Sequence, residues 1–388
     1  MIYVGFSQKF HPTLFDVHNM KKILLKKYSL LLAISLFSGC TQNHSKTPPV
    51  TESAVIESHY DLVALLYQYC HETVTQLNHA ITSFNQNVND KQFQDIKEQW
   101  KKSKRCYSMA EATRFSGTYI DEIDTLINAW PIDELYIDYV ETSAHSGIIG
   151  NKQIDITPSS LLNLNEQQGE TNISIGYHAI EFLLWGQDIS PDGPGNRSWT
   201  DYSDTSNADR RKTYLAVAGQ LLQSHFYELS NDWQNNLNQP LSFDGIITGL
   251  GTFIKAELVG ERMQVALDTY DQEDEQSCFS DQTNYDIIYN IKGVIGLLEG
   301  KLTLENQTHE AEGLGLLALF NHKNPVLSQT LLDDMNKALE LIQQLTLPFD
   351  QAILPTNPQQ RQVIENVASL MSIAARNLRV LQHKTHAE

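Results

Sequence analysis

The stretch Tyr60–Phe84, YDLVALLYQYCHETVTQLNHAITSF, shows the pattern that decides the fold class. Its apolar side chains recur three or four residues apart and therefore share one face of a helix, at Leu62, Leu65, Leu66, Tyr69, Val74, Leu77 and Ile81. Asp90 is expected to cap a second helix that extends to about Phe115. Shorter helices are predicted over 119–129, 132–139 and 173–185.

Helical periodicity continues through the second half of the chain, where long helices are predicted over 208–233, 242–267, 281–298, 325–345 and 358–382. No segment alternates convincingly as a strand does, so the predicted fold class is all-α. The polar stretch Gly186–Ser206 contains Gly and Pro and is the expected domain boundary. We therefore expect two helical bundles, over 59–200 and 201–388, whose similar size suggests a duplication.

Residues 1–39 are predicted to be a secretory signal. The apolar run over 29–37 is too short to span a bilayer, which takes about 20 residues, and it follows a basic region that contains Lys21, Lys22, Lys26 and Lys27. Such signals normally begin with Met followed by Lys. We therefore expect translation to start at Met20 rather than Met1.

The signal ends in Leu-Phe-Ser-Gly-Cys40, which resembles a bacterial lipoprotein box. In such a box Cys40 becomes the lipidated first residue; an ordinary signal with an incidental Cys is the alternative. Thr41, rather than Asp, resembles the outer-membrane sorting pattern, so we expect a lipoprotein that faces the periplasm from the outer membrane. Residues 40–58 are expected to form the lipidated Cys and a polar tether.

The charge balance excludes one class of partner. The chain has 28 Lys+Arg and 47 Asp+Glu, a net charge of −19. Nucleic-acid binding needs clustered basic residues, so it is not expected. Removal of residues 1–39 leaves 23 basic and 46 acidic residues, a charge of −23. Attachment to the membrane should therefore depend on the lipid alone.

Three cysteines remain in the mature chain. Cys70 and Cys106 lie on consecutive predicted helices and could form a disulfide in an exported protein, although buried free thiols are the alternative. Cys278 would be left without a partner. No C-x-x-C or Cys/His spacing typical of a structural zinc site occurs.

The segment Gly176–Gly186, GYHAIEFLLWG, is hydrophobic nearly all round and should be a buried helix. His178 and Glu181 are three residues apart and share a face of it. A buried carboxylate is costly unless it is paired or ligated. Two alternatives follow: half of a metal site, or a buried hydrogen-bonded His–Glu pair. The zincin pattern is absent, because Thr75 stands where His71 and Glu72 would need a second His.

Two other segments carry charges in informative positions. Six acids and no Lys or Arg occur over 268–281, a pattern typical of a solvated loop, but the apolar Cys278 and Phe279 favour an anchored one. Its oxygen donors would suit a hard cation, or iron together with His178. Glu111 and Arg114 are also three residues apart. They form either a surface ion pair or a partly buried one beside aromatic residues such as Trp130.

These segments together resemble the imelysin family of bacterial envelope proteins. The matching motifs, in family order, are Glu111-Ala-Thr-Arg-Phe-Ser-Gly117, Ala129-Trp-Pro-Ile-Asp133, Gly176-Tyr-His-Ala-Ile-Glu181, Glu261-Arg-Met263, Glu273-Asp-Glu-Gln-Ser-Cys-Phe-Ser-Asp281 and Pro348-Phe-Asp350. The acidic block looks most like the iron-regulated branch, which more often has His at the position of Gln276. The resemblance implies two four-helix-bundle-like domains with a site at their junction. His178 and Glu181 would line it, with Glu111, Arg114, Trp130, Arg262, Ser277 and Asp281 as companions.

The first functional hypothesis is an envelope lipoprotein of iron uptake. It would bind iron, or a small anionic iron-associated ligand, between the bundles, with other uptake proteins as partners. The expected metal donors are His178, Glu181, Glu273 and Asp281. An arginine in the site would favour an anionic ligand.

The second hypothesis is a zinc metallopeptidase. His178, Glu181 and an unidentified third ligand would hold zinc, and Glu273 or Asp281 would act as general base. A docking surface without chemistry is the third possibility.

Overall fold

The structure is a computed structural model that describes residues 50–385 except 145, 191–192, 236–240 and 305–309. The signal, Met20, Cys40 and Thr41 lie outside the described residues. The first helix, α2 (Glu52–Gln86), begins where the Thr51 hydroxyl accepts a hydrogen bond from the Ala54 N–H at 3.2 Å. The predicted tether is therefore wrong for residues 52–58, which are helical.

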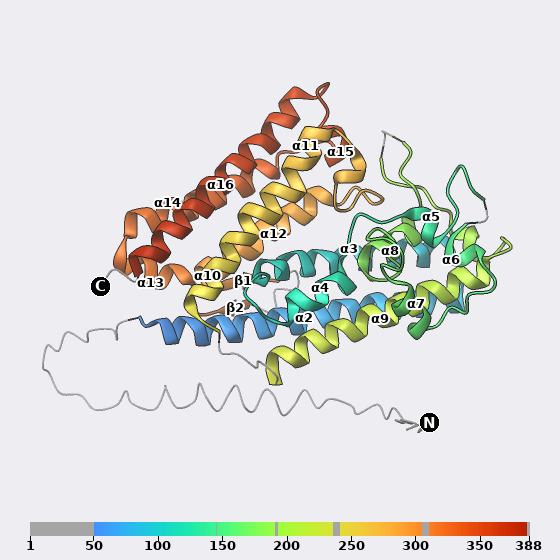
Figure 1. Cartoon of the computed structure of the whole chain (residues 1–388), viewed down its shortest axis with the longest axis horizontal. Coiled ribbons are helices and arrows are strands. Elements are labelled where there is room, and N and C mark those ends of the chain that lie inside the picture. Colours follow the sequence, from blue (N-terminus) through green and yellow to red (C-terminus); the bar gives the residue numbers. More distant parts are fainter. Residues whose placement is uncertain (1–49, 145, 191–192, 236–240, 305–309, 386–388) are drawn as a thin grey trace, which may run out of the picture. The chain divides into compact units, whose positions relative to one another are not determined.

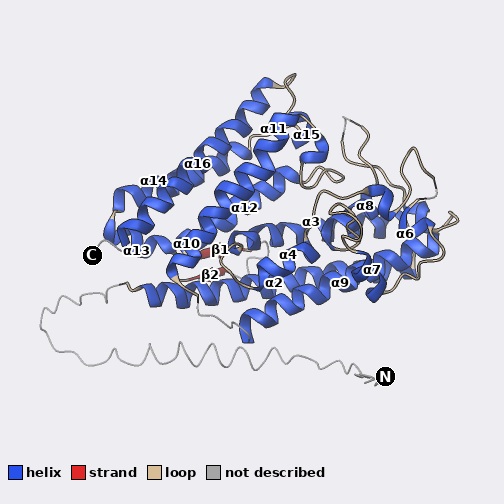
Figure 2. Cartoon of the chain, viewed as in Figure 1, coloured by secondary structure: helices blue, strands red, loops and turns tan. Residues whose placement is uncertain are grey.

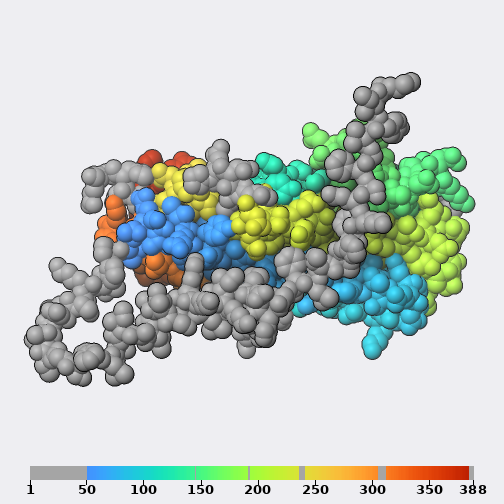
Figure 3. All heavy atoms as spheres, turned by 90° about the horizontal axis from the view of Figure 1, so that it is seen from below, coloured from blue at the N-terminus to red at the C-terminus, as the bar shows by residue number. Residues whose placement is uncertain are grey.

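One group of helices surrounds α2 (Figure 1). Helix α2 packs along both α3 (Asp90–Ala110) and α9 (Ala208–Asn235), and α9 also contacts α4 (Tyr119–Ile127) and α8 (Gly176–Trp185). Figure 3 shows one face of this group, on which α2 and α9 lie side by side. Helix α9 comes after the expected domain boundary near residue 200, yet it packs against α2, which comes before that boundary. The division into two domains and the duplication stay predictions.

A second group contains α10 (Phe243–Thr252), the π-helix η3 (Phe253–Gln264), α12 (Thr283–Glu299), α14 (Pro325–Ile342) and α16 (Pro358–Thr385). Helix α16 packs on α14, α10 and η3, and α12 packs on α14. Helix α12 also lies against α3, so it connects the two groups. None of the described helices is both long and apolar enough to cross a membrane.

The all-α prediction is confirmed, with one small exception. Strands β1 (Lys301–Thr303) and β2 (Glu310–Glu312) pair antiparallel, with Leu302 opposite Ala311 (Figure 2). Three-residue strands are too short to show alternation in a sequence. The sequence predicted some of the remaining short helices and missed others. These helices are η1 (Glu111–Thr113), α5 (Glu134–Ile137), α6 (Gly147–Gly150), α7 (Pro158–Leu164), η2 (Trp199–Tyr202), α11 (Val265–Thr269), η4 (Gln272–Asp274), α13 (Leu316–Lys323) and α15 (Phe349–Ala352).

Helix α8 is buried along its whole length, as its apolar sequence predicts. It begins at Gly176, three residues later than expected, because φ is +86° there. It ends at Gly186, where φ is +71°. The Trp100 indole donates to the Tyr177 carbonyl at 3.0 Å, and the Tyr202 hydroxyl donates to the Leu183 carbonyl at 2.6 Å. These bonds hold the helix that carries His178 and Glu181.

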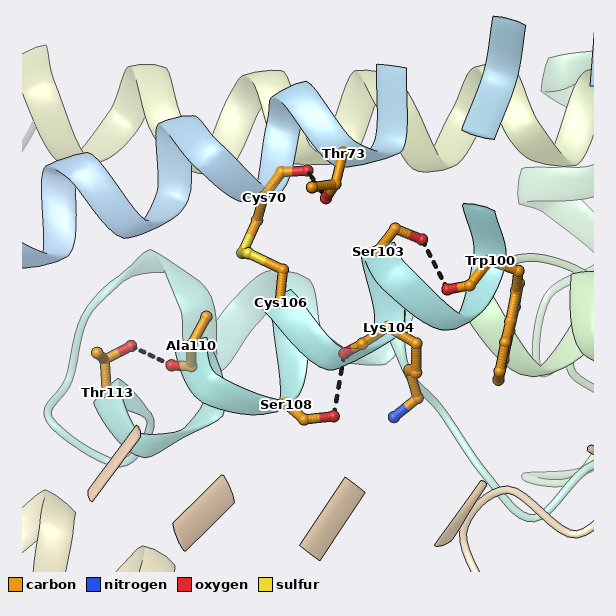
Figure 4. Close-up of a disulfide and its surroundings, with 9 residues drawn as sticks. All are labelled: Cys70, Thr73, Trp100, Ser103, Lys104, Cys106, Ser108, Ala110 and Thr113. Atoms are coloured by element: carbon orange, nitrogen blue, oxygen red, sulfur yellow. Dashed lines mark hydrogen bonds between the residues drawn. A yellow bond between two sulfur atoms is a disulfide. The ribbon is translucent and has the colours of Figure 1, made fainter. Parts of the chain in front are cut away.

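A disulfide joins α2 to α3. Cys70 and Cys106 are buried, their Cα atoms are 5.4 Å apart, and they are bonded to each other (Figure 4). Of the two alternatives that the sequence allowed, pairing is therefore correct. Cys278 is a buried free thiol.

Replacing Cys70 and Cys106 with Ser should destabilise the protein by about 3–4 kcal/mol, because the bond closes a loop between residues 36 positions apart. The free energy of unfolding in urea measures this loss. Cys278→Ser is the matched control, since it removes a buried thiol without opening the disulfide. An unfolding free energy equal to that of the control would contradict the prediction.

Candidate functional site

His178 and Glu181 meet on the buried face of α8. His178 Nδ1 lies 2.8 Å from Glu181 Oε2, and the two residues are 2% and 0% exposed. His178 Nε2 lies 3.2 Å from Asn128 Oδ1. Glu181 Oε1 accepts hydrogen bonds from the Ser280 N–H at 3.0 Å and from its hydroxyl at 2.6 Å. The structure therefore shows the buried hydrogen-bonded pair that one alternative described; metal binding by the two residues stays a prediction.

A buried ion pair supports this arrangement from the other side of Asn128. The Arg262 guanidinium donates to both carboxylate oxygens of Glu111, and both residues are 0% exposed. Asn290 accepts from Arg262 at 3.1 Å and donates to Glu111 at 3.1 Å. Burial alone would raise the pKa of Glu111, but the guanidinium outweighs it and brings the pKa to about 2. Glu111 is therefore ionised and buried, so of the two alternatives for Glu111 and Arg114 the surface ion pair is wrong.

The ionised Glu111 determines where the protons lie. The Asn128 amide N–H₂ donates to Glu111 Oε1 at 3.0 Å, so its Oδ1 faces His178 Nε2, which must donate. In a neutral imidazole Nδ1 is then an acceptor, and the proton between it and Oε2 belongs to Glu181. Burial lowers the pKa of His178 to about 3 and raises that of Glu181 to about 8, which agrees with this assignment. At pH 7 the pair is neutral.

A second layer of charge lies on the π-helix η3. Its i→i+5 repeat brings together Glu257 and Arg262, which are five residues apart, and the two side chains form an ion pair at 2.8 Å. Arg114 binds Glu257 at 3.2 Å and Asp124 at 2.9 Å. Its distance to Glu111 is 3.8 Å. Two arginines are thus neutralised by three carboxylates.

A cleft of about 760 Å³ opens beside this network. Among the residues in its wall, Arg114 is the one cation. The wall also contains four carboxylates. Its residues are Arg114, Asp124, Thr125, Asn128, Ala129, Trp130, Glu166, Gln168, Gly169, Glu170 and Glu257. Glu166 and Gln168 have φ values of +58° and +70°, so the loop adopts left-handed backbone where it borders the cleft. The wall therefore has an excess of negative charge.

The acidic loop is anchored, so the solvated alternative is wrong for its second half. The backbone turns inward after Asp274, and the next six residues are buried. The Ser277 hydroxyl donates to Asp286 at 2.6 Å, and the Phe279 ring packs 5.2 Å from that of Phe182. Ser277, expected as a ligand-binding companion, is thus occupied by Asp286.

The structure does not bring the four expected metal donors into one group. Glu273 is largely exposed and shares with His178 a narrow crevice of about 10 Å³, room for about one water molecule. Trp130 lines both this crevice and the large cleft. Of the expected donors, Asp281 belongs to the cluster of possible ligands found among the described residues, where it joins Glu275 and Asp350.

Sequence reasoning missed Asn128, Ser280, Glu257 and Asp350 as site residues. Asn128 directly precedes the Ala-Trp-Pro-Ile-Asp motif, and Ser280 and Asp350 lie inside the Cys-Phe-Ser-Asp and Pro-Phe-Asp motifs. Their position in motifs was the available signal. Glu257 had none, because its contact with Arg262 depends on the π-helix.

Glu181→Gln should retain the fold, because its amide can donate to His178 Nδ1 and accept from Ser280 as the protonated carboxyl does. Wild type should lose a few kcal/mol as pH rises from about 4.5 to about 8, since the unfolded state releases the Glu181 proton first. His178 acts oppositely in both proteins. Between pH 5 and 8.5 the free energy of unfolding of wild type, measured in urea, should therefore fall relative to that of the variant by a few kcal/mol. The assignment would be contradicted if the stability of the two proteins depended equally on pH, or if the variant were several kcal/mol less stable than wild type at pH 5. Glu57→Gln, at an exposed position, is the control.

Comparisons with solved structures show that the fold is shared with other proteins. A solved structure described as an iron-regulated protein A precursor from Parabacteroides distasonis ATCC 8503 superimposes with a TM-score of 0.66, at 17% identity over 87% of this chain and 97% of that chain. An imelysin-like protein from Psychrobacter arcticum 273-4 has a TM-score of 0.56, at 13% identity over 83% and 93%. These likenesses show a shared fold.

No curated protein sequence matches the chain. The family profile described as imelysin matches residues 65–376, which include all of the resembling motifs from Glu111 to Asp350. This match extends over most of the chain and contains both the buried network and the acidic loop. The chain belongs to the imelysin family.

Proposed function

We propose that this protein is a lipid-anchored envelope protein of iron uptake that binds a positively charged iron species in the 760 Å³ cleft. The charge of the cleft wall is the observation that carries the proposal. The one guanidinium there, Arg114, is already paired with Asp124 and Glu257. Glu166 and Glu170 add two further negative charges. A cation is therefore favoured over the anionic complex that the sequence suggested.

The size of the cleft supports a ligand larger than a bare ion. Clefts of about 300–1,000 Å³ are typical for small-molecule ligands. A hydrated ion or a small cationic complex would keep some of its own ligands and interact with the carboxylates through them. Trp130 and Ala129 add apolar surface to the wall.

The buried network would hold the wall in place. Glu257 accepts from both Arg114 and Arg262, so its position depends on the Arg262–Glu111 pair behind it. Asn128 belongs to the cleft wall and also contacts His178 and Glu111. In this proposal His178 and Glu181 position the wall rather than bind the ligand.

The zinc-peptidase hypothesis meets a specific difficulty. Both ring nitrogens of His178 already have hydrogen-bond partners, Glu181 and Asn128. Zinc could bind only after one of these bonds broke, and Glu181 would also have to release its proton. No distinct observation favours the peptidase, so we do not propose it.

Export is supported by the Cys70–Cys106 bond, because disulfides persist in oxidising compartments. We propose that Cys40 carries the lipid and that the protein faces the periplasm from the outer membrane. Cys40→Ala should move the protein from the membrane fraction to the soluble envelope fraction and abolish incorporation of labelled palmitate. Cys278→Ala is the control and should remain in the membrane. A Cys40 variant that stays membrane-bound would refute the anchor.

Iron uptake can be tested in iron-limited cells that lack the native gene. Cells producing the Glu166→Gln/Glu170→Gln variant should accumulate radioactive iron several-fold more slowly than wild type, because the cleft loses two of its four carboxylates. Glu57→Gln/Glu98→Gln removes the same charge from exposed positions on α2 and α3 and should behave as wild type. Equal accumulation by the cleft variant, at equal protein level, would overturn the proposal.

A further inference from the structure

Three carboxylates from two separate segments converge beside the acidic loop. Glu275 and Asp281 come from the loop, and Asp350 lies in the short helix α15 (Phe349–Ala352). Each offers one oxygen, and these oxygens lie within 4.8 Å of one another. Glu275 is 2% exposed and Asp350 is 6% exposed. Three acids at this distance repel one another strongly unless something neutralises them.

The cluster lacks the partners that buried carboxylates normally have. Neither oxygen of Glu275 accepts a hydrogen bond of good geometry, and Oδ1 of Asp281 and Oδ1 of Asp350 have no partner either, whereas Oδ2 of Asp350 accepts from the Gln351 amide. No lysine, arginine or histidine among the described residues forms an ion pair with any of the three. Such groups usually cost several kcal/mol when left unsatisfied. The unpaired oxygens therefore indicate a missing cationic ligand.

The electrostatics of the three groups agree with this geometry. Burial and then the charge of Asp350 raise the pKa of Glu275 well above its usual range, although the Thr283 hydroxyl acts in the opposite direction. Burial and Asp350 raise the pKa of Asp281 to about 7. Asp188 contributes further negative charge. The charge of Asp350 thus makes Glu275 and Asp281 harder to ionise in the absence of a positive charge.

The loop that carries two of these acids is held from both sides. Ser280 donates to Glu181 on α8, and Ser277 donates to Asp286 on α12. The Ser277 N–H also donates to the Thr283 hydroxyl at 2.9 Å. Asp281 lies between these anchors with φ at +55°. The carboxylates therefore cannot separate easily, and a ligand would meet a preformed arrangement.

We propose that Glu275, Asp281 and Asp350 form a binding site for a hard divalent cation such as Mn²⁺ or Ca²⁺. Oxygen-only donors select hard cations, since softer ions prefer nitrogen or sulfur ligands. The site is distinct from the large cleft, whose wall contains none of these three residues. It stands whether or not the cleft binds iron.

The test uses the mature full-length protein, stripped with EDTA and dialysed. Thermal unfolding is followed while Mn²⁺ or Ca²⁺ is added, and calorimetry measures the affinity. The melting temperature of wild type should rise with either ion. Asp350→Asn should bind at least tenfold more weakly and lose most of the rise. In EDTA this variant should be at least as stable as wild type, because the substitution removes repulsion between buried carboxylates.

Controls separate this site from the cleft. Glu166→Gln/Glu170→Gln should retain the full cation-dependent rise, since its substitutions lie in the cleft wall. Asp281→Asn, at a half-buried position, provides a second variant if Asp350→Asn does not fold. The proposal is overturned if wild type shows neither heat nor a change in melting temperature at millimolar cation, or if the folded variants bind as tightly as wild type.

Discussion

The buried ion pair between Arg262 and Glu111 is the interaction on which the rest of the site depends. It joins η1, at the end of α3, to the π-helix η3, and both side chains are 0% exposed. Removing two charges from water is costly, and here the cost is offset because every remaining donor and acceptor is used, by Asn128, Asn290 and Glu257. The pair keeps Glu111 ionised, which orients the Asn128 amide and so determines the protonation of His178 and Glu181.

This arrangement divides the charges of the protein into two kinds. Those around Arg262 are paired, and the His178–Glu181 contact is neutral, so the buried network itself has little capacity to take up another ion, and the excess negative charge of the cleft beside it comes from Glu166 and Glu170. In the cluster of Glu275, Asp281 and Asp350, both oxygens of Glu275 and one oxygen of each aspartate lack a hydrogen-bond partner. The two regions are nevertheless connected, because Ser280 donates to Glu181 from the same loop that carries Glu275 and Asp281. A change of charge at the loop would therefore reach α8 directly.

Most of the helical framework could be predicted, because amphipathic periodicity is a local property that survives in any all-α packing. The exceptions have physical causes. Helix α2 begins at Glu52 because Thr51 caps it, although the preceding residues are polar. Helix α3 ends at Ala110 rather than Phe115, since the chain tightens into η1 and Phe115 takes a φ of +63°. The helical periodicity over 242–267 gave no sign that part of this segment is a π-helix, and the short strands β1 and β2 left no periodic signal. Helix α9 packs against α2 from beyond the expected boundary.

The sequence by itself determined the helical class, the burial of α8, the shared helix face of His178 and Glu181 and the family, because these depend on residue spacing and on motifs. Only the tertiary structure decided which charges face each other. Arg262 reaches Glu111 across 151 positions, and Asp350 joins Glu275 of the acidic loop from helix α15. Coulomb interactions and desolvation depend on distance in space rather than along the chain, so the same acids read from the sequence could have been ligands, ion-pair partners or solvent-exposed residues.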